Sequence, residues 1–315
     1  MLPIASLLIA ILGLLAIQIA GRRHPALSVI TLATLLTLPL LNFLPKIHLT
    51  LPTDSTLLDS PSSNLFPFLY LGGFLFFAGQ FLRDLISFRF WKAQATPLPN
   101  NDSHLQEIIA ATKKQLNYQP SVQVLVHPQL QSPVAAGLLR PRVYLPEASL
   151  SWNTETLTAV LLHELGHHAR RDLWTSLGAR LACIVNWFNP LAWILRRQLL
   201  AQCEFACDAR VLATGINAKS YAHTLCDLAL PAGSKAPTLA IAMATKSSLR
   251  DRVENLLSPH QPLTLLPIVT TILLTAGTAL ALSVLRPSIP RSFAIPSDIV
   301  QEAQFRLGAN PFPGN

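Results

Sequence analysis

The stretch His163-Glu164-Leu165-Gly166-His167 matches the pattern H-E-x-x-H, and the interpretation of the whole chain depends on it. It follows a segment that is typical of a helix start, because Asn153 or Ser151 can accept hydrogen bonds from N–H groups of a first turn. Positions i and i+4 of a helix share one face, so the two histidines can bind the same metal ion. Glu164 then lies beside the open coordination position, where hydrolysis requires a base.

A second helix is expected from Asn189-Pro190 to Gly215, since Asn is a good cap, Pro suits the first turn and Gly ends helices. It contains Glu204 and Asp208, which are again four residues apart on one face. A zinc hydrolase with two histidine ligands needs a third protein ligand, which Glu204 can supply. Asp208 can accept the outer ring N–H of His163 and fix the ring's orientation. The two helices together predict a site for one Zn²⁺ ion per chain.

The composition of the 315-residue chain is unusually apolar, with 50% hydrophobic and only 13% charged residues. This composition favours membrane-spanning segments over an ordinary soluble protein. The net charge is +8, but the basic residues flank apolar runs and no nucleic-acid-binding motif accompanies them. We therefore attribute the charge to membrane orientation, and we expect the bilayer and no direct nucleic acid among the partners.

Four apolar runs have the length of membrane spans. Three precede the H-E-x-x-H motif and one follows it, at residues 2–20, 26–44, 65–82 and 262–285. Basic residues after the first and third runs predict that both termini lie outside and that the intervening domain is cytoplasmic. The expected organisation has four parts: a membrane module (1–92), a cytoplasmic zinc metalloprotease domain (93–260), the fourth span and a short extracytoplasmic tail (286–315).

The domain at residues 93–260 is expected to be mainly helical with a small β-sheet, so the fold class is α+β on a multi-pass helical membrane protein. Short strands are expected at 121–127, 132–137 and 141–146. One of the last two is either an exposed edge that pairs with an extended peptide or part of a plain structural hairpin. Residues 173–200 indicate a helical hairpin that either spans the membrane or forms a buried or interfacial pair.

Several segments taken together resemble peptidase family M56, the BlaR1/MecR1-type membrane zinc metalloproteases, over residues 1–285. The segments are SPVAAGLLRPRVYLP (132–146), HELGHHARRD (163–172), NWFNPLAWILRR (186–197) and EFACDAR (204–210). The resemblance implies a gluzincin-like zinc domain in which His163, His167 and Glu204 bind the metal. It also implies that Glu164 is catalytic and that Asp208 is the supporting acid.

The resemblance further implies a signal-transduction protease in a bacterial inner membrane that cleaves a cytoplasmic protein, usually a winged-helix repressor, and often itself. Residues 232–245 are expected to form a loose loop and are the candidate region for self-cleavage. The tail at 286–315 is expected to be too short for the penicillin-binding sensor domain of the β-lactam receptors and contains no Ser-x-x-Lys motif. The signal would then enter through the spans, the loop at 45–64, the tail or a separate partner, and the partners could include a separate sensor or a second copy of the chain in a homodimer.

The expected chemistry is hydrolysis of a peptide bond by a water that Glu164 deprotonates. The donor for the oxyanion is left open among four residues. These candidates for oxyanion or substrate contacts are His168, Arg171, Tyr221 and His223. Two alternatives remain open: a protease of the M48 type, with CAAX or quality-control function, and a non-catalytic membrane receptor or scaffold.

Overall fold

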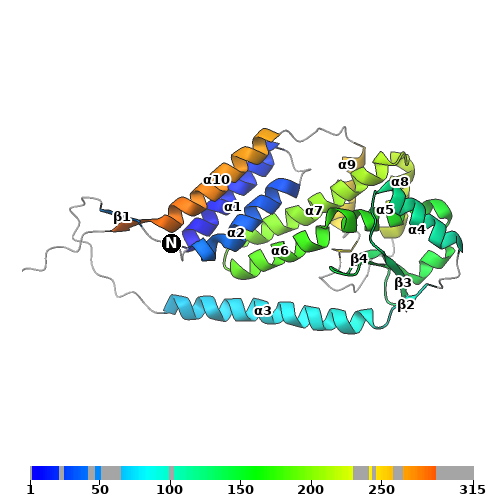
Figure 1. Ribbon diagram of the computed structural model, residues 1–315, viewed down its shortest axis with the longest axis horizontal. Coiled ribbons are helices and arrows are strands. Elements are labelled where there is room, and N and C mark those ends of the chain that lie inside the picture. Colours follow the sequence, from blue (N-terminus) through cyan, green and yellow to red (C-terminus); the bar gives the residue numbers. More distant parts are fainter. Residues whose placement is uncertain are drawn as a thin grey trace, which may run out of the picture.

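A computed structural model describes residues 2–20, 25–41, 47–50, 65–98, 103–229, 241–242, 246–257 and 265–288. The described helices are α1 (Leu2–Ala20), α2 (Pro25–Leu41), α3 (Leu65–Lys92), α4 (Ser103–Gln115), α5 (Thr154–Arg170), α6 (Asp172–Val185), α7 (Pro190–Ala213), α8 (Ala218–Ala229), α9 (Lys246–Leu256), α10 (Leu265–Val284) and the 3₁₀ helix η1 (Glu147–Ser151). The described strands are β1 (Ile47–Thr50), β2 (Thr96–Pro97), β3 (Gln123–His127), β4 (Val134–Ala136), β5 (Arg142–Pro146), β6 (Ile241–Ala242) and β7 (Leu285–Ser288). The molecule is elongated, with apolar helices at one end and the larger sheet and its helices at the other (Figure 1).

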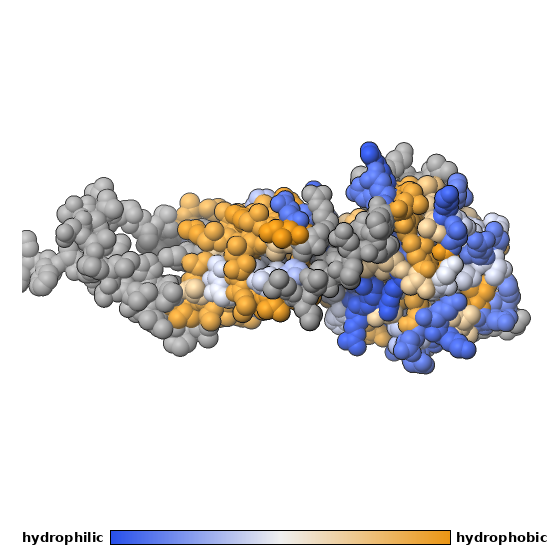
Figure 2. Space-filling model, turned by 90° about the horizontal axis from the view of Figure 1, so that it is seen from above, coloured by the Kyte–Doolittle hydropathy of each residue, from blue (hydrophilic) through white to orange (hydrophobic). Residues whose placement is uncertain are grey.

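Two of the described helices are long and apolar enough to cross a membrane, over residues 67–92 of α3 and 267–284 of α10. Shorter apolar helices cover residues 3–19 and 25–41. On the face shown in Figure 2, hydrophobic residues cover the helical end of the molecule, whereas hydrophilic and hydrophobic residues are mixed over the sheet end. Among the described residues, two helices thus qualify as candidate spans, where the sequence predicted four.

The boundaries of two predicted spans differ from those of the helices. The second helix ends at Leu41, and residues 42–46 lie outside the described part of the chain. The third helix does not end at Leu82 but continues to Lys92. Charged residues end an apolar run, but they do not end a helix. One of them, Asp84 within α3, accepts a hydrogen bond from Arg180 of α6 at 2.8 Å.

The predicted helical hairpin at residues 173–200 is formed by α6 and α7, which pack against α1 and α2 (Figure 1). Buried hydrogen bonds tie its turn to these helices. Ser6 of α1 donates to Asn186 Oδ1 and accepts from Asn189 Nδ2, both at 2.8 Å. Asn186 Nδ2 also donates to the Leu35 carbonyl of α2. The hairpin is thus an internal layer of the apolar helix group, and α7 extends from there into the other end of the molecule.

The larger sheet has five strands in the order β2-β3-β5-β4-β6. Strands β3 and β5 are parallel, and the other pairs are antiparallel. Two strands of this sheet were not predicted: β2 lies near the start of the domain expected at 93–260, and β6 lies in the expected loose loop at 232–245. Each has only two residues, which is too short for a periodic sequence signal.

Local sequence signals fix the two helices that carry the H-E-x-x-H and Glu204 motifs. The Asn153 side chain accepts from Thr156 N and caps α5, and the Asn189 side chain accepts from Leu191 N and caps α7. Both caps confirm the sequence-based expectation, and of the two candidates for α5, Asn153 and Ser151, Asn153 is the cap. Gly215, with φ +94°, follows the end of α7 as predicted. Helix α5 is largely buried between α4, α7 and the sheet.

Candidate metal centre

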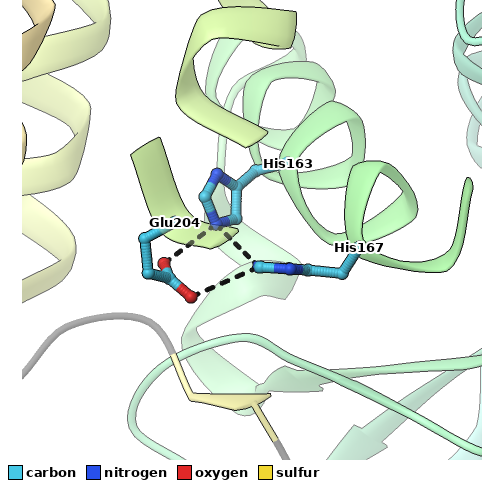
Figure 3. Close-up of side chains that lie close together, drawn as sticks. All are labelled: His163, His167 and Glu204. Carbon is cyan, nitrogen blue, oxygen red and sulfur yellow. Dashed lines mark hydrogen bonds and ion pairs between the residues drawn. The ribbon is translucent and has the colours of Figure 1, made fainter. Parts of the chain in front are cut away.

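His163 and His167 of α5 and Glu204 of α7 direct three ligand atoms toward one another (Figure 3). His163 Nε2 lies 3.2 Å from His167 Nε2 and 3.3 Å from a Glu204 oxygen, and His167 Nε2 lies 3.4 Å from the other oxygen. The edge of a tetrahedron is about 1.6 times its bond length, so zinc bonds of about 2.0–2.1 Å correspond to edges of about 3.3–3.4 Å. The two histidine nitrogens have about this separation, and each faces a different oxygen of the Glu204 carboxylate, so the residues present fit a zinc ion held by two histidines and one carboxylate.

The outer nitrogen of each histidine faces a buried carboxylate. His163 Nδ1 lies 3.1 Å from Asp208 Oδ1, as the sequence suggested. His167 Nδ1 lies 3.1 Å from Asp172 Oδ2, an acid to which sequence reasoning gave no role. Such partners fix the tautomer and orientation of a metal-binding histidine. Asp172 stands five residues after His167, at the start of the next helix. The acid is visible in the sequence HELGHHARRD, but its position beside His167 depends on the left-handed turn at Arg171, which the sequence does not reveal.

Arg252 of α9 is the second residue that sequence reasoning missed. Its side chain is fully buried, and its Nη1 lies 3.2 Å from Glu204 Oε2. It also forms an ion pair with Asp208. A single cation from a distant helix therefore compensates two buried acids of the centre.

Glu164 is completely buried, and neither of its carboxylate oxygens has a hydrogen-bond partner among the residues that the structure describes. Burial raises the pKa of this carboxyl, although the neighbouring histidines act in the opposite direction. A buried carboxylate without partners is costly to a fold. A role as the acceptor of a proton from a molecule that enters the site would explain why this carboxylate is buried without partners.

The electrostatic balance of the centre favours a positive charge. Burial and the charge of Arg252 lower the pKa of His163, but hydrogen bonds to Asp208 and Glu204 outweigh them and raise it to about 9. Burial alone would raise the pKa of Glu204, yet the charges of His167 and Arg252 hold it below its usual value. The same acids that stabilise a proton here would stabilise a metal cation.

A second group that could hold a metal, His167, Asp172 and Cys207, shares a residue with the first. Cys207 Sγ lies 3.3 Å from His167 Nδ1 and 3.5 Å from Asp172 Oδ2. Burial, followed by the charge of Asp172, raises the pKa of the Cys207 thiol well above its usual value. A thiol that keeps its proton is a poor ligand, so we interpret this group as support for His167.

The four oxyanion candidates from the sequence lie in different surroundings. The Tyr221 hydroxyl is buried and hydrogen-bonds Asp208 Oδ1 at 2.8 Å and His163 Nδ1 at 3.0 Å. The His168 ring bonds the carbonyl of Arg142 at 3.0 Å, facing the sheet. Arg171 is exposed in a left-handed turn, and His223 is exposed on α8. The structure thus brings Tyr221 to the outer side of a histidine and keeps the two exposed residues out of the buried cluster.

A buried His-His-Glu group joined to long apolar helices is the combination found in membrane metallopeptidases as a class. The chain belongs to the BlaR1 peptidase M56 family, whose family model matches residues 65–256. This match includes all five residues of the motif set, namely His163, Glu164, His167, Glu204 and Asp208.

Curated relatives are similar over part of their length. Regulatory protein BlaR1 of Bacillus licheniformis is 32% identical over 114 residues, which are 36% of this chain and 19% of that protein. The methicillin resistance mecR1 protein of Staphylococcus aureus is 25% identical over 112 residues, 35% of this chain and 19% of that protein. Regulatory protein BlaR1 of Staphylococcus aureus is 24% identical over 155 residues, 48% of this chain and 26% of that protein. The matched segments thus span about a quarter or less of these relatives.

Proposed function

We propose that this protein is a membrane-embedded zinc metalloendopeptidase of a bacterial signalling system. The observation that carries the proposal is the buried carboxylate of Glu164, on the helix that presents two of the three candidate metal ligands. Within the described part of the chain, this carboxylate has no hydrogen-bond partner. In a scaffold without catalytic function, nothing would offset the cost of burying a carboxylate without partners. A hydrolase has a use for such a group, because its general base must be ready to accept a proton.

In the proposed reaction, His163, His167 and Glu204 would hold a zinc ion, and the bound ion would supply an acidic water and a polarised carbonyl group. Glu164 takes one proton from the attacking water as its oxygen bonds to the peptide carbonyl carbon. The C–N bond then breaks, and Glu164 delivers the proton to the leaving nitrogen. Asp208 and Asp172 keep the two histidine rings oriented throughout.

We propose that an extended substrate is held by main-chain pairing with an edge of the sheet. The pairing of β6 with β4 suggests that a segment of the chain itself can be such a substrate. Strand β4 packs against α5, and its outer edge pairs with β6 in antiparallel register, Val134 with Ala242 and Ala135 with Ile241. Main-chain pairing at a sheet edge is a general way to hold an extended peptide. We therefore propose cleavage of the chain itself close to β6, in addition to cleavage of a separate protein.

The biological substrate is proposed from the names of the relatives to which this chain is similar. Its relatives are named as a regulatory protein and a methicillin resistance protein. We propose that the substrate is a cytoplasmic transcriptional repressor. We also propose that the zinc domain lies in the cytoplasm and that both termini lie outside the cell membrane. The basic residues that follow the first and third apolar runs support this orientation.

The proposed activity is tested with purified full-length protein and a synthetic peptide of residues 236–246, APTLAIAMATK. Parent protein with zinc should cut the peptide at one bond, as measured by mass spectrometry. Glu164→Gln should bind zinc equally and leave the peptide intact, while Glu155→Gln, an exposed change on the same helix, should behave as the parent. Cleavage by Glu164→Gln at the parental rate would show that Glu164 is not the base.

Self-cleavage is tested separately in membranes that contain the chain with a tag at each end. Parent protein should give two fragments whose junction lies near β6, and Glu164→Gln should remain whole. Intact parent protein that nevertheless cuts the peptide would reject self-cleavage and retain the peptidase.

A further inference from the structure

A cavity of about 460 Å³ lies away from the metal centre, between the end of α3, the turn that joins β4 to β5, and the start of α6. Phe88 and Lys92 of α3 form one wall, and Trp174 of α6 forms another. The turn at residues 137–142 closes a third side. None of the candidate metal ligands is among the residues that line this space.

The walls of the cavity are fixed by packing. Trp91, in the last turn of α3, stacks on the His127 ring with centroids 4.1 Å apart and on Phe88 with centroids 5.8 Å apart. His127 Nε2 also hydrogen-bonds the Trp91 carbonyl at 3.0 Å. In the turn, Gly137 has φ +89°, and a Cβ there would lie 2.1 Å from the Arg140 carbonyl oxygen. The cavity is therefore formed before any ligand arrives.

The charge of the lining has one sign. Three of the lining residues are cations, Lys92, Arg140 and Arg142, and none is an acid. Arg142 is oriented by a hydrogen bond from its Nε to Gln123 Oε1 at 3.1 Å. Cations that converge on one space from two different elements select an anion, and guanidinium groups suit phosphate oxygens especially.

The depth of the cavity relative to a bilayer selects the kind of anion. Helix α3 has 28 residues. At about 1.5 Å per residue it is about 42 Å long, which equals the thickness of a bilayer with its headgroups, about 40–45 Å. If α3 crosses the membrane, Lys92 at its end lies at headgroup level. Leu139 and Trp174 beside the cavity are 84% and 47% exposed, as expected of side chains that reach the interface.

We propose that this cavity binds the phosphate headgroup of an anionic phospholipid. Lys92, Arg140 and Arg142 contact the phosphate oxygens, while Leu139 and Trp174 lie against the glycerol and the first acyl carbons. The site would anchor the sheet end of the molecule to the membrane at a defined height. The proposal rests on the membrane location of α3 and is independent of peptide hydrolysis.

The experiment uses the full chain in a mild detergent and counts bound lipid by native mass spectrometry. The probes are a phosphatidylglycerol, a phosphatidylcholine with the same acyl chains, glycerol 3-phosphate and an acidic peptide. Parent protein should prefer phosphatidylglycerol. Lys92→Gln with Arg140→Gln should weaken that binding by about thirty-fold, because each cation contributes about fivefold near an anionic lipid.

The matched control is Lys114→Gln with Lys219→Gln, which removes the same charge from exposed positions outside the cavity. It should bind phosphatidylglycerol as the parent does, and zinc retention by both double variants shows that they are folded. Equal loss in the control, or no preference for phosphatidylglycerol, would overturn the proposal. Equal binding of glycerol 3-phosphate would assign the cavity to a soluble phosphate, and stronger binding of the peptide would assign it to a protein partner.

Discussion

Arg252 and Asp208 form a two-armed ion pair in which both side chains have no exposure to solvent. Arg252 Nε donates to Asp208 Oδ2 at 2.8 Å, and its Nη2 donates to Oδ1. Asp208 in turn contacts His163. The helix that immediately precedes α10 in the chain is thereby joined to a candidate metal ligand through two side chains.

Replacing Arg252 with Met should destabilise the protein, because it leaves Asp208 and Glu204 buried without their cation. Loss of one partner of a buried ion pair costs about 3–5 kcal/mol. Zinc supplies positive charge to the same acids, so the deficit should be larger in metal-free protein than with zinc. Thermal unfolding of the full chain with chelator and with zinc measures both values. Arg250→Met, two residues away and exposed, should unfold as the parent does; an equal deficit with and without zinc would contradict the shared-charge explanation.

Asp172→Asn should weaken zinc binding although Asp172 is not a candidate ligand. Loss of a carboxylate that orients a ligand histidine typically costs about 10–100-fold in metal affinity. Competition with a chromogenic chelator measures the affinity. Asp227→Asn, an exposed change on α8, is the control. Unchanged zinc affinity in Asp172→Asn would mean that His167 is oriented by packing alone.

The stabilising effect of Asp208 should disappear at acidic pH. Burial alone would raise the pKa of Asp208, but the charge of Arg252 and the bonds to His163 and Arg252 hold it well below its usual range. A carboxyl whose pKa is lower in the folded state stabilises the fold above its unfolded pKa, about 3.9, and loses that effect as pH falls further. The free energy of unfolding of metal-free parent protein should exceed that of Asp208→Asn between pH 5 and 8. The difference should shrink below about pH 4; a difference that persists there would contradict it.

The metal centre was largely predictable because two of its parts are local. The i, i+4 spacings of His163 with His167 and of Glu204 with Asp208 are fixed by helix geometry, whatever the tertiary fold. Arg252 had no such signal, since it lies 44 residues from Asp208 and its surrounding sequence resembles an ordinary basic helix. Its role arises only when α9 packs against α7. Burial of an arginine is a tertiary property that composition and spacing do not encode.

The predicted membrane helices show a similar limit. Hydropathy identified the apolar runs, but it placed the end of α3 at Leu82, where charges begin, while the helix continues to Lys92. By sequence alone, either glycine of the pair Gly72-Gly73 would permit close helix contact. The structure assigns that role to Gly73 only: a Cβ there would lie 2.2 Å from the Trp187 ring, whereas one on Gly72 would meet nothing within 4 Å. Adjacent residues of a helix point about 100° apart, so one of the two must face away from a given partner.

Gly73→Ala should therefore destabilise the contact between α3 and the turn of the α6–α7 hairpin. Trp187 cannot retreat freely, because its Nε1 donates to the Tyr70 carbonyl at 3.2 Å and its ring stacks near Phe77. Forcing an extra carbon into a packed contact costs about 1–3 kcal/mol. The midpoint of thermal unfolding in detergent should fall by about 2 °C or more, since about 1 kcal/mol corresponds to about 2–4 °C in chains of somewhat smaller size.

Gly72→Ala provides the matched control, because it makes the same chemical change one position earlier on the same helix. Its side chain would lie in open space, and alanine has a higher helix propensity than glycine. This variant should be as stable as the parent or slightly more stable. Equal destabilisation by both changes would point to a general effect on α3, while no effect from Gly73→Ala would mean that α3 does not rest on Trp187. The end of α3 would keep its place beside the cavity in either case, because Trp91 stacks on His127 there independently of Trp187.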